Sequence, residues 1–317
     1  MIGRREGAAV AALLVALAIS GCSADVTPGP VDDSGSSSLP SSEPTTDGGG
    51  HAQFAIITDY GNCDQGEADV AEMVAAWHPQ IIATAGDNTQ GATDCAPFTQ
   101  SVGDYYSSFL TGPDGPILFP VPGNHDYEDD GAGEAAYLDY FAYLWSLSDN
   151  PLWYEVSTGN VNLFMLDSEA SAEQLTEQRE WLESSLSAAR SESSASWNIV
   201  VFHRPPFTSG PHEPNVAMRP EAGWDYAGWG ADLVVSGHQH VYEELKVGGL
   251  PYVVAGVGTG GLPRPCPAER VDGSVVCVEG TGALLVTATD RTLTLDYRKP
   301  DSAMGTSLRT LEISRDS

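Results

Sequence analysis

The feature of this 317-residue sequence that most restricts its fold is an alternation of short apolar runs with segments of helical spacing. Segments 67–77, 102–110 and 135–145 have that spacing, and a capping box at Ser171 opens another helix. Alternation followed by β-rich sequence predicts an α/β domain in which two sheets pack together and helices cover them. The runs that predict strands are 52–58, 81–85, 116–121, 152–156, 161–166, 197–202, 233–235, 252–257, 283–289, 292–297 and 307–313.

Short polar motifs follow five of the apolar runs. Each alone is typical of a turn, a helix cap or a packed histidine. Together they supply carboxylate, amide oxygen and imidazole, which suit Fe, Zn or Mn, at strand ends where ligand sites of α/β sheets form. The set therefore predicts a site for two ions that share one carboxylate. The motifs are Asp59-Tyr60-Gly61, Gly86-Asp87-Asn88, Gly123-Asn124-His125-Asp126, His203, and Gly237-His238-Gln239-His240.

The order of these motifs resembles the calcineurin-like metallophosphoesterase superfamily, and within it the purple acid phosphatases and bacterial relatives of the tartrate-resistant type. The resemblance covers nearly all of residues 52–245 and extends to Phe202-His203-Arg204-Pro205-Pro206. It implies a four-layer α/β/β/α sandwich, in which two mixed β-sheets are flanked by helices.

The resemblance also implies two divalent or mixed-valence ions of Fe, Mn or Zn. We call the ligand sets of these ions the first site and the second site, with Asp87 bridging them. The first site would comprise Asp59, Asp87 and His240, and the second site would comprise Asp87, Asn124, His203 and His238.

Two further histidines are candidates for the chemistry. His125 would lie beside the ions as general acid or phosphate-binding group, and His212 resembles a substrate-binding histidine of the phosphatase branch. A solvated loop residue between prolines is an equally good interpretation of His212. Two cations would lower the pKa of a bound water, and a positioned acid would protonate the leaving alkoxide.

The first site departs from the family pattern at two positions. Purple members carry tyrosine three residues after the bridging aspartate, and other members carry histidine at the third place of the first motif. Here those positions hold Gln90 and Gly61. Four alternatives follow: Gln90 coordinates through its amide oxygen, Tyr60 or another side chain supplies a ligand, water completes the shell, or the first site is weak. A neutral ligand favours divalent ions over ferric iron.

The resulting prediction is metal-dependent hydrolysis of phosphate esters, with monoesters as the first choice. One alternative is a phosphodiesterase with the same core. Another is a non-catalytic metal- or phosphate-binding lipoprotein with a degenerate first site. Arg204 and Arg219 could bind phosphate, although surface ion pairing is their commoner fate.

The net charge of −30 restricts the partners. Such a surface repels nucleic-acid phosphates, which excludes a general DNA or RNA binder. A small phosphate ester would have to be attracted by ions or by a few arginines.

The amino terminus predicts export. Residues 1–21 have a basic start, an apolar core and small residues at the end, as a signal peptide does. The sequence Ile19-Ser20-Gly21-Cys22 resembles a lipoprotein box, which would place a lipid on Cys22. The alternative is a plain signal peptide and a secreted protein. Residues 22–50 would form a disordered linker, and 51–317 the metallophosphoesterase domain.

Four further cysteines remain in the expected domain. An even number in an exported chain predicts two disulfides. We expect Cys63 to pair with Cys95 and Cys266 with Cys277, because each pair would join loops that the motifs bring close.

Overall fold

The computed structural model describes residues 51–91, 95, 97–113, 115–128, 133–193 and 196–315. The expected signal peptide, Cys22 and the linker lie outside these residues. Within the described part, no helix is both long and apolar enough to cross a membrane.

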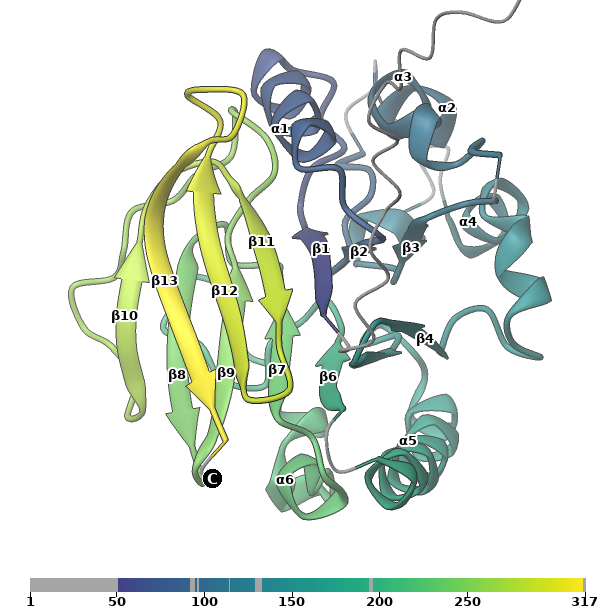
Figure 1. Cartoon of the computed structure of the whole chain (residues 1–317), viewed down its shortest axis with the longest axis vertical. Coiled ribbons are helices and arrows are strands. Elements are labelled where there is room, and N and C mark those ends of the chain that lie inside the picture. The colour runs from purple at the N-terminus through teal and green to yellow at the C-terminus, as the bar shows by residue number, and fades with distance from the viewer. Residues whose placement is uncertain are drawn as a thin grey trace, which may run out of the picture. The chain divides into compact units, whose positions relative to one another are not determined.

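The first sheet has six strands in the order β13-β12-β11-β1-β2-β3 (Figure 1). Strands β1, β2 and β3 are parallel, and the others pair antiparallel. Their bounds are β1 Ala52–Ile57, β2 Ile82–Thr84, β3 Leu118–Pro120, β11 Ala283–Ala288, β12 Thr292–Lys299 and β13 Thr306–Ser314. Every residue of β2 and β3 is buried, which explains why both read as continuous apolar runs.

The second sheet has seven strands in the order β10-β8-β9-β7-β6-β5-β4. Strands β5, β6, β7 and β9 are parallel, whereas β4, β8 and β10 pair antiparallel. Their bounds are β4 Tyr154–Thr158, β5 Val161–Met165, β6 Trp197–Val201, β7 Leu233–Ser236, β8 Tyr242–Val247, β9 Leu250–Ala255 and β10 Ser274–Val278.

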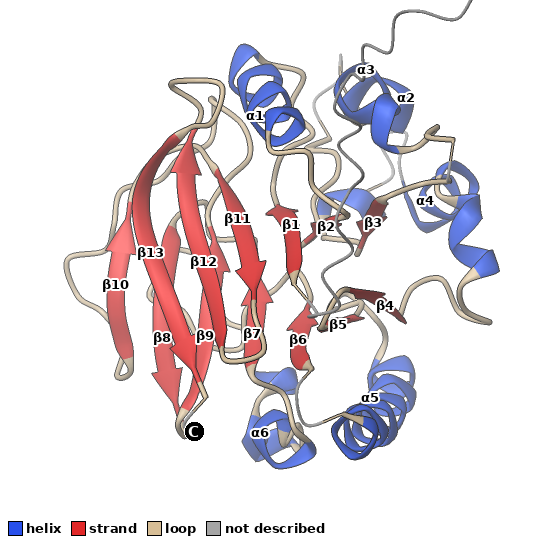
Figure 2. Ribbon diagram, viewed as in Figure 1, coloured by secondary structure: helices blue, strands red, loops and turns tan. Residues whose placement is uncertain are grey.

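Helices flank both sheets. Figure 2 shows α1 to α4 beside the six-stranded sheet and α5 and α6 beside the seven-stranded sheet. The apolar face of α5 is buried through Leu182 and Leu186, and its capping box at Ser171 is present as expected. The predicted architecture of two mixed sheets between helices is confirmed. The bounds are α1 Gln65–Ala76, α2 Phe98–Ser101, α3 Gly103–Tyr106, α4 Gly133–Tyr140, α5 Ala172–Glu192 and α6 Tyr226–Trp229.

Two expected helices are shorter than the sequence indicated. The segment 102–110 divides into α3 and a 3₁₀ turn, Ser107–Phe109, and α4 ends at Tyr140 before a second 3₁₀ turn, Ala142–Ser146. Aromatic side chains of both segments pack against rings elsewhere in the chain: the ring centroid of Tyr106 lies 5.0 Å from that of Tyr60, and that of Phe141 lies 5.5 Å from that of Phe98 in α2. Tertiary packing of large rings outweighs local helical spacing here.

Strands β8 and β10 were absent from the sequence prediction. Strand β8 carries Glu243 and Glu244, which are both buried. Thr208 and Ser274 donate hydrogen bonds to Glu243, and Arg309 forms an ion pair with Glu244. These partners come from distant segments, so the local sequence resembled a polar surface.

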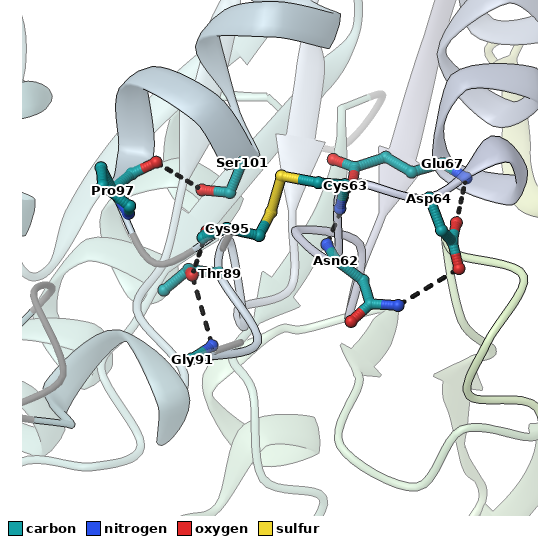
Figure 3. The surroundings of a disulfide bond; sticks show 9 residues. All are labelled: Asn62, Cys63, Asp64, Glu67, Thr89, Gly91, Cys95, Pro97 and Ser101. Carbon is teal, nitrogen blue, oxygen red and sulfur yellow. Dashed lines mark hydrogen bonds between the residues drawn. A yellow bond between two sulfur atoms is a disulfide. The ribbon is translucent and has the colours of Figure 1, made fainter. Parts of the chain in front are cut away.

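Both predicted disulfides are confirmed. Cys63 pairs with Cys95, joining the loop after β1 to the loop after β2, and Figure 3 shows the surrounding residues. Cys266 pairs with Cys277, joining the loop after β9 to β10.

Candidate metal centre

The five polar motifs follow five parallel strands. Asp59, Asp87 and Asn124 follow β1, β2 and β3 of one sheet, whereas His203 and His238 follow β6 and β7 of the other. The carboxyl ends of parallel strands emerge at one edge of a sheet. Two such edges meet here, which brings the motifs together.

The ligand atoms form two overlapping clusters. In one, atoms of Asp59, Asp87 and His240 lie within 4.8 Å of one another, and in the other, atoms of Asp87, His203 and His238 do. Asp87 is common to both clusters, as predicted for a bridging carboxylate. The clusters therefore bring together five of the six predicted ligands, and the sixth, Asn124, lies on the wall of the adjoining cleft.

Three of the predicted ligand atoms are buried and have no hydrogen-bond partner. They are Asp59 Oδ1, Asn124 Oδ1 and His203 Nε2. The second oxygen of Asp59 is fully used, because it accepts from Thr58 Oγ1 at 2.7 Å and from the backbone N–H of His238 at 2.8 Å. Buried polar atoms without partners are costly, so this arrangement fits a bound cation.

Backbone carbonyls set the tautomers of two histidines. His203 Nδ1 lies 2.8 Å from the Ala85 carbonyl, and His240 Nδ1 lies 3.1 Å from the Leu262 carbonyl. Each Nδ1 donates, which leaves a lone pair on Nε2. These lone pairs face carboxylates, with His203 Nε2 3.3 Å from Asp87 Oδ2. A proton or a metal ion must lie between such a pair of atoms, and the ligand set suits two ions.

Four of the predicted ligands have left-handed backbone geometry. The φ angles are 51° at Asp59, 51° at Asp87, 73° at His238 and 56° at His240. This region is unfavourable for residues with a side chain, and such strain concentrates at functional sites. The local backbone is therefore shaped by the site and not by propensity.

Two glycines permit the close approach of the motifs. A Cβ at Gly237 would lie 1.9 Å from Thr58 Oγ1, and one at Gly123 would lie 2.2 Å from Asp87 Oδ1. Neither position has room for a side chain. The glycines in these motifs are thus required by packing between the strand ends.

The electrostatics of the cluster favour positive charge. Burial lowers the pKa of His203, but the carboxylate of Asp87 outweighs it and raises that pKa to about 10. Burial raises the pKa of Asp59, whereas the imidazole of His240, with its Nε2 3.3 Å from Asp59 Oδ1, lowers it well below its usual range. Burial lowers the pKa of His238 to about 2. The field that would protonate His203 also favours a cation.

Asp126 ties the turn after β3 to the loop after β2. Its carboxylate accepts the backbone N–H of Gly123 at 2.7 Å, the side-chain amide of Asn88 at 2.8 Å and the backbone N–H of Thr89 at 3.1 Å. These bonds fix the position from which His125 enters the site.

His125 lies at the border of the cluster. Its backbone N–H donates to Asp87 Oδ1 at 3.0 Å, and its Nε2 lies 4.0 Å from Asp87 Oδ2. Its Nδ1 lies 3.0 Å from Glu128 Oε1, one 3₁₀ turn further along. The angle does not suit a hydrogen bond, so this contact is an ion pair when the ring is protonated. Sequence reasoning missed Glu128.

A cleft of about 530 Å³ opens onto the cluster. His212 lies on its wall, with its ring centroid 4.7 Å from that of His238. The side chain of Gln239 holds this loop by accepting from the His212 N–H at 3.0 Å and donating to its carbonyl at 2.9 Å. Burial, and then the charge of His240, lower the pKa of His212. The cleft wall also includes Gln90, Asn124, His125, Arg204 and Arg264.

Gly61 and Gln90, the two departures from the family pattern, are in direct contact. The backbone N–H of Gln90 donates to the Gly61 carbonyl at 2.7 Å. A Cβ at Gly61 would lie 2.0 Å from the carbonyl oxygen of Asn88, so no histidine fits there. The Nε2 of Gln90 is buried without a partner beside the cleft. Rotation of the amide would bring its oxygen to the same position.

Arg204 and Arg219, the two arginines that could bind phosphate, differ in position. Arg204 lies on the cleft wall, and its Nε is 2.8 Å from both carboxylate oxygens of Glu169. Arg219 is outside the cleft wall: its Nε donates to the Pro206 carbonyl, and its guanidinium stacks 4.7 Å from the Phe207 ring centroid. Arg264, which sequence reasoning did not consider, does line the cleft.

Residues 52–242 match the profile of the calcineurin-like phosphoesterase family, a span that exceeds half of the sequence. The chain belongs to this family. Purple acid phosphatase 15 of Arabidopsis thaliana is 28% identical over 191 residues, which cover 56% of this chain and 35% of that protein. Purple acid phosphatase 18 of the same plant is 34% identical over 107 residues, covering 33% of this chain and 24% of that protein. The chain thus spans about a third or less of these relatives.

Two solved structures share the fold. The anchor GAP50 of the Plasmodium inner membrane complex has a TM-score of 0.62 at 15% identity, covering 84% of this chain and 90% of that chain. A dimetal phosphatase from Danio rerio has a TM-score of 0.61 at 14% identity, covering 83% of this chain and 98% of that chain. At these identities the likeness shows the architecture alone.

Proposed function

We propose that this protein hydrolyses phosphate esters, monoesters in the first place, at a two-ion centre formed by the first and second sites. The observation that carries the proposal is the convergence of buried ligand atoms without partners, Asp59 Oδ1, Asn124 Oδ1 and His203 Nε2, around Asp87. Family membership supports metal-dependent phosphoester hydrolysis, and the similarity to purple acid phosphatases supports a monoester substrate.

The chain's own residues divide the work. Two cations held by these ligands would supply an activated water and would neutralise phosphoryl charge. His125 is the proton donor to the leaving oxygen, because it borders the bridging Asp87 and lines the cleft. Glu128 positions the His125 ring from its Nδ1 side. His212 provides a further contact surface for the ester on the cleft wall, beside the ring of His238.

Replacement of His125 tests the proposed acid. His125→Ala should lower kcat by about a hundredfold to ten-thousandfold, the usual contribution of a positioned general acid, while two ions per chain remain bound. Metal content is measured by plasma mass spectrometry, and turnover with an aryl phosphate. His51→Ala, which removes an exposed histidine outside the cluster, is the matched control. Unchanged turnover in His125→Ala would remove it from the mechanism.

The proposed location is outside the cytoplasm, with a signal peptide at 1–21, a lipid on Cys22, a linker to residue 50 and the metallophosphoesterase domain at 51–317. Two disulfides support an oxidising compartment. Cys22→Ala should release the protein from membranes in cell fractionation. Membrane retention of that variant without lipid labelling would exclude the anchor.

A further inference from the structure

Arg264 occupies a part of the cleft that the family motifs do not describe. It lies beyond residues 52–242, in the loop that follows β9. Strand β9 is parallel to β7, with Ser236 paired to Val254. Its following loop therefore emerges at the same edge of the sheet as His238 and His240.

Two backbone contacts fix this loop to the first site. The N–H of Arg264 donates to the His240 carbonyl at 3.0 Å, and the Leu262 carbonyl accepts from His240 Nδ1 at 3.1 Å. The segment thus runs beside His240 and is held from both its backbone and its ring. Any displacement of Arg264 would disturb a proposed metal ligand.

The loop is also rigid for covalent reasons. Arg264 lies between Pro263 and Pro265, so φ is fixed on both sides and Arg264 itself is restricted to extended backbone. Cys266 follows immediately and is bonded to Cys277, and its N–H donates to Glu279 Oε1 at 2.9 Å. An arginine on such a segment loses little backbone entropy when it binds a ligand.

The charge of Arg264 is available. Two arginines line the cleft, Arg204 and Arg264. The guanidinium of Arg204 forms an ion pair with Glu169. Among the residues that the structure describes, no ion pair or side-chain hydrogen bond involves the guanidinium of Arg264, although Glu213 also lines the cleft. In a protein of net charge −30, an unpaired arginine beside a phosphate-binding centre is a local attractor for anions.

The cleft is large enough for more than the phosphoryl group. Its volume of about 530 Å³ is in the range of sites that hold a complete small molecule. We propose that Arg264 is a specificity residue that binds a second anionic group of the substrate. The preferred esters then carry a carboxylate or a second phosphate on the alcohol. This inference rests on the proposed function.

The test compares esters that differ only in that second charge. The probes are para- and meta-carboxyphenyl phosphate and the corresponding carbamoylphenyl phosphates, in which a neutral amide replaces the carboxylate. The wild-type protein should favour the carboxylates through KM. Arg264→Ala should reduce this preference by about tenfold, the value of a hydrogen bond to a charged group, and Arg264→Lys should retain part of it.

The matched control is Arg270→Ala, which removes the same charge from the same loop outside the cleft wall. Calorimetric binding of the two corresponding benzylphosphonates, with and without the carboxylate, gives a readout that needs no turnover. Loss of the preference in Arg264→Ala alone supports the proposal.

The other outcomes overturn it. An equal rise in KM for charged and neutral esters would show that Arg264 binds the transferred phosphoryl group instead. Hydrolysis with the same preference in the wild-type protein and Arg264→Ala would reject the inference and leave the proposed function intact. No hydrolysis of any of the esters by metal-loaded wild-type protein, and no phosphonate binding, would reject the proposed function itself.

Discussion

The first and second sites share Asp87 but are built differently. In the second site, the His203 ring is anchored by the Ala85 carbonyl at the end of a parallel strand. In the first site, a glycine and an amide, Gly61 and Gln90, stand where other family members supply a further ligand. Both sites therefore draw on strand ends, but the first depends in addition on how the loops after β1 and β2 pack.

The contact between the loops explains the difference. Because a Cβ at Gly61 would lie 2.0 Å from the Asn88 carbonyl oxygen, the loops after β1 and β2 approach too closely for a side chain at this position. The Cys63–Cys95 disulfide joins the same two loops (Figure 3). Loop packing leaves no room for a side-chain ligand at position 61, so we expect the first site to hold an ion more weakly than the second.

Removing the shared ligand should have the largest effect because it affects both sites. Asp87→Ala deletes the oxygen that faces His203 and the one that accepts from the His125 N–H. Bound metal should fall from two ions to fewer than one per chain, and kcat/KM should fall by at least about a thousandfold. Plasma mass spectrometry and turnover measure the two quantities. Asp290→Ala, at an exposed turn, is the control. Two tightly held ions in Asp87→Ala would refute the bridging role.

Removal of the Cys63–Cys95 disulfide should have the next largest effect on the first site. It closes a loop of 32 residues, and the chain-entropy relation gives a loss of about 4 kcal/mol in the free energy of unfolding for the Cys63→Ser, Cys95→Ser double variant. Chelator should also remove the first ion at lower concentration. Denaturant unfolding and chelator titration measure these effects.

The Cys266–Cys277 disulfide is the matched control for general destabilisation. Its span of 11 residues gives a loss of about 3 kcal/mol. If chelator sensitivity changed equally in both double variants, it would reflect stability and not the position of the loop.

Gln90 determines how far the first site can be strengthened. Gln90→Tyr should raise the affinity of the first ion by about tenfold, because a phenolate binds a trivalent cation better than an amide does. Loading with ferric iron should produce a visible absorption band. Gln90→Leu introduces a side chain of similar volume without a ligand atom, and it should lower the affinity of the first site for its ion. Equal metal affinity in all three proteins would show that Gln90 lies outside the coordination shell.

The sequence predicted the fold from the alternation of strands and helices. It also predicted that the polar motifs lie close together, because each motif follows the carboxyl end of a parallel strand. Motifs that follow parallel strands must meet, whatever the details of the loops. The sequence did not reveal Arg264, because only the register of β9 and two hydrogen bonds to the His240 segment bring it to the cleft. It did not reveal the effect of Gly61 either, since the missing ligand follows from a steric contact with Asn88. Glu128 was visible at three residues from His125, and the 3₁₀ turn explains that spacing.

Substitution of Glu67 should have the smallest effect, because this residue only supports a loop of the first site. Its Oε2 accepts the backbone N–H groups of Asn62 and Cys63 at 3.0 and 2.6 Å, so it supports the loop that carries Asp59 (Figure 3). Burial raises its pKa from 4.5 to about 9, and the two hydrogen bonds only partly oppose this. The folded state therefore binds the proton more tightly than the unfolded chain does.

The raised pKa of Glu67 makes the stability of the folded protein depend on pH. The stability from protonated Glu67 is fully present below the unfolded pKa of 4.5 and is lost as the pH rises toward about 9. Glu67→Gln keeps the acceptor oxygen and removes the titration. Between about pH 5 and about pH 9, the variant should lose less stability than the wild-type protein, by about 1 kcal/mol or more. Thermal unfolding across this range measures the difference. Parallel curves would mean that Glu67 is ionised in the folded protein, and that the loop of the first site tolerates a buried carboxylate.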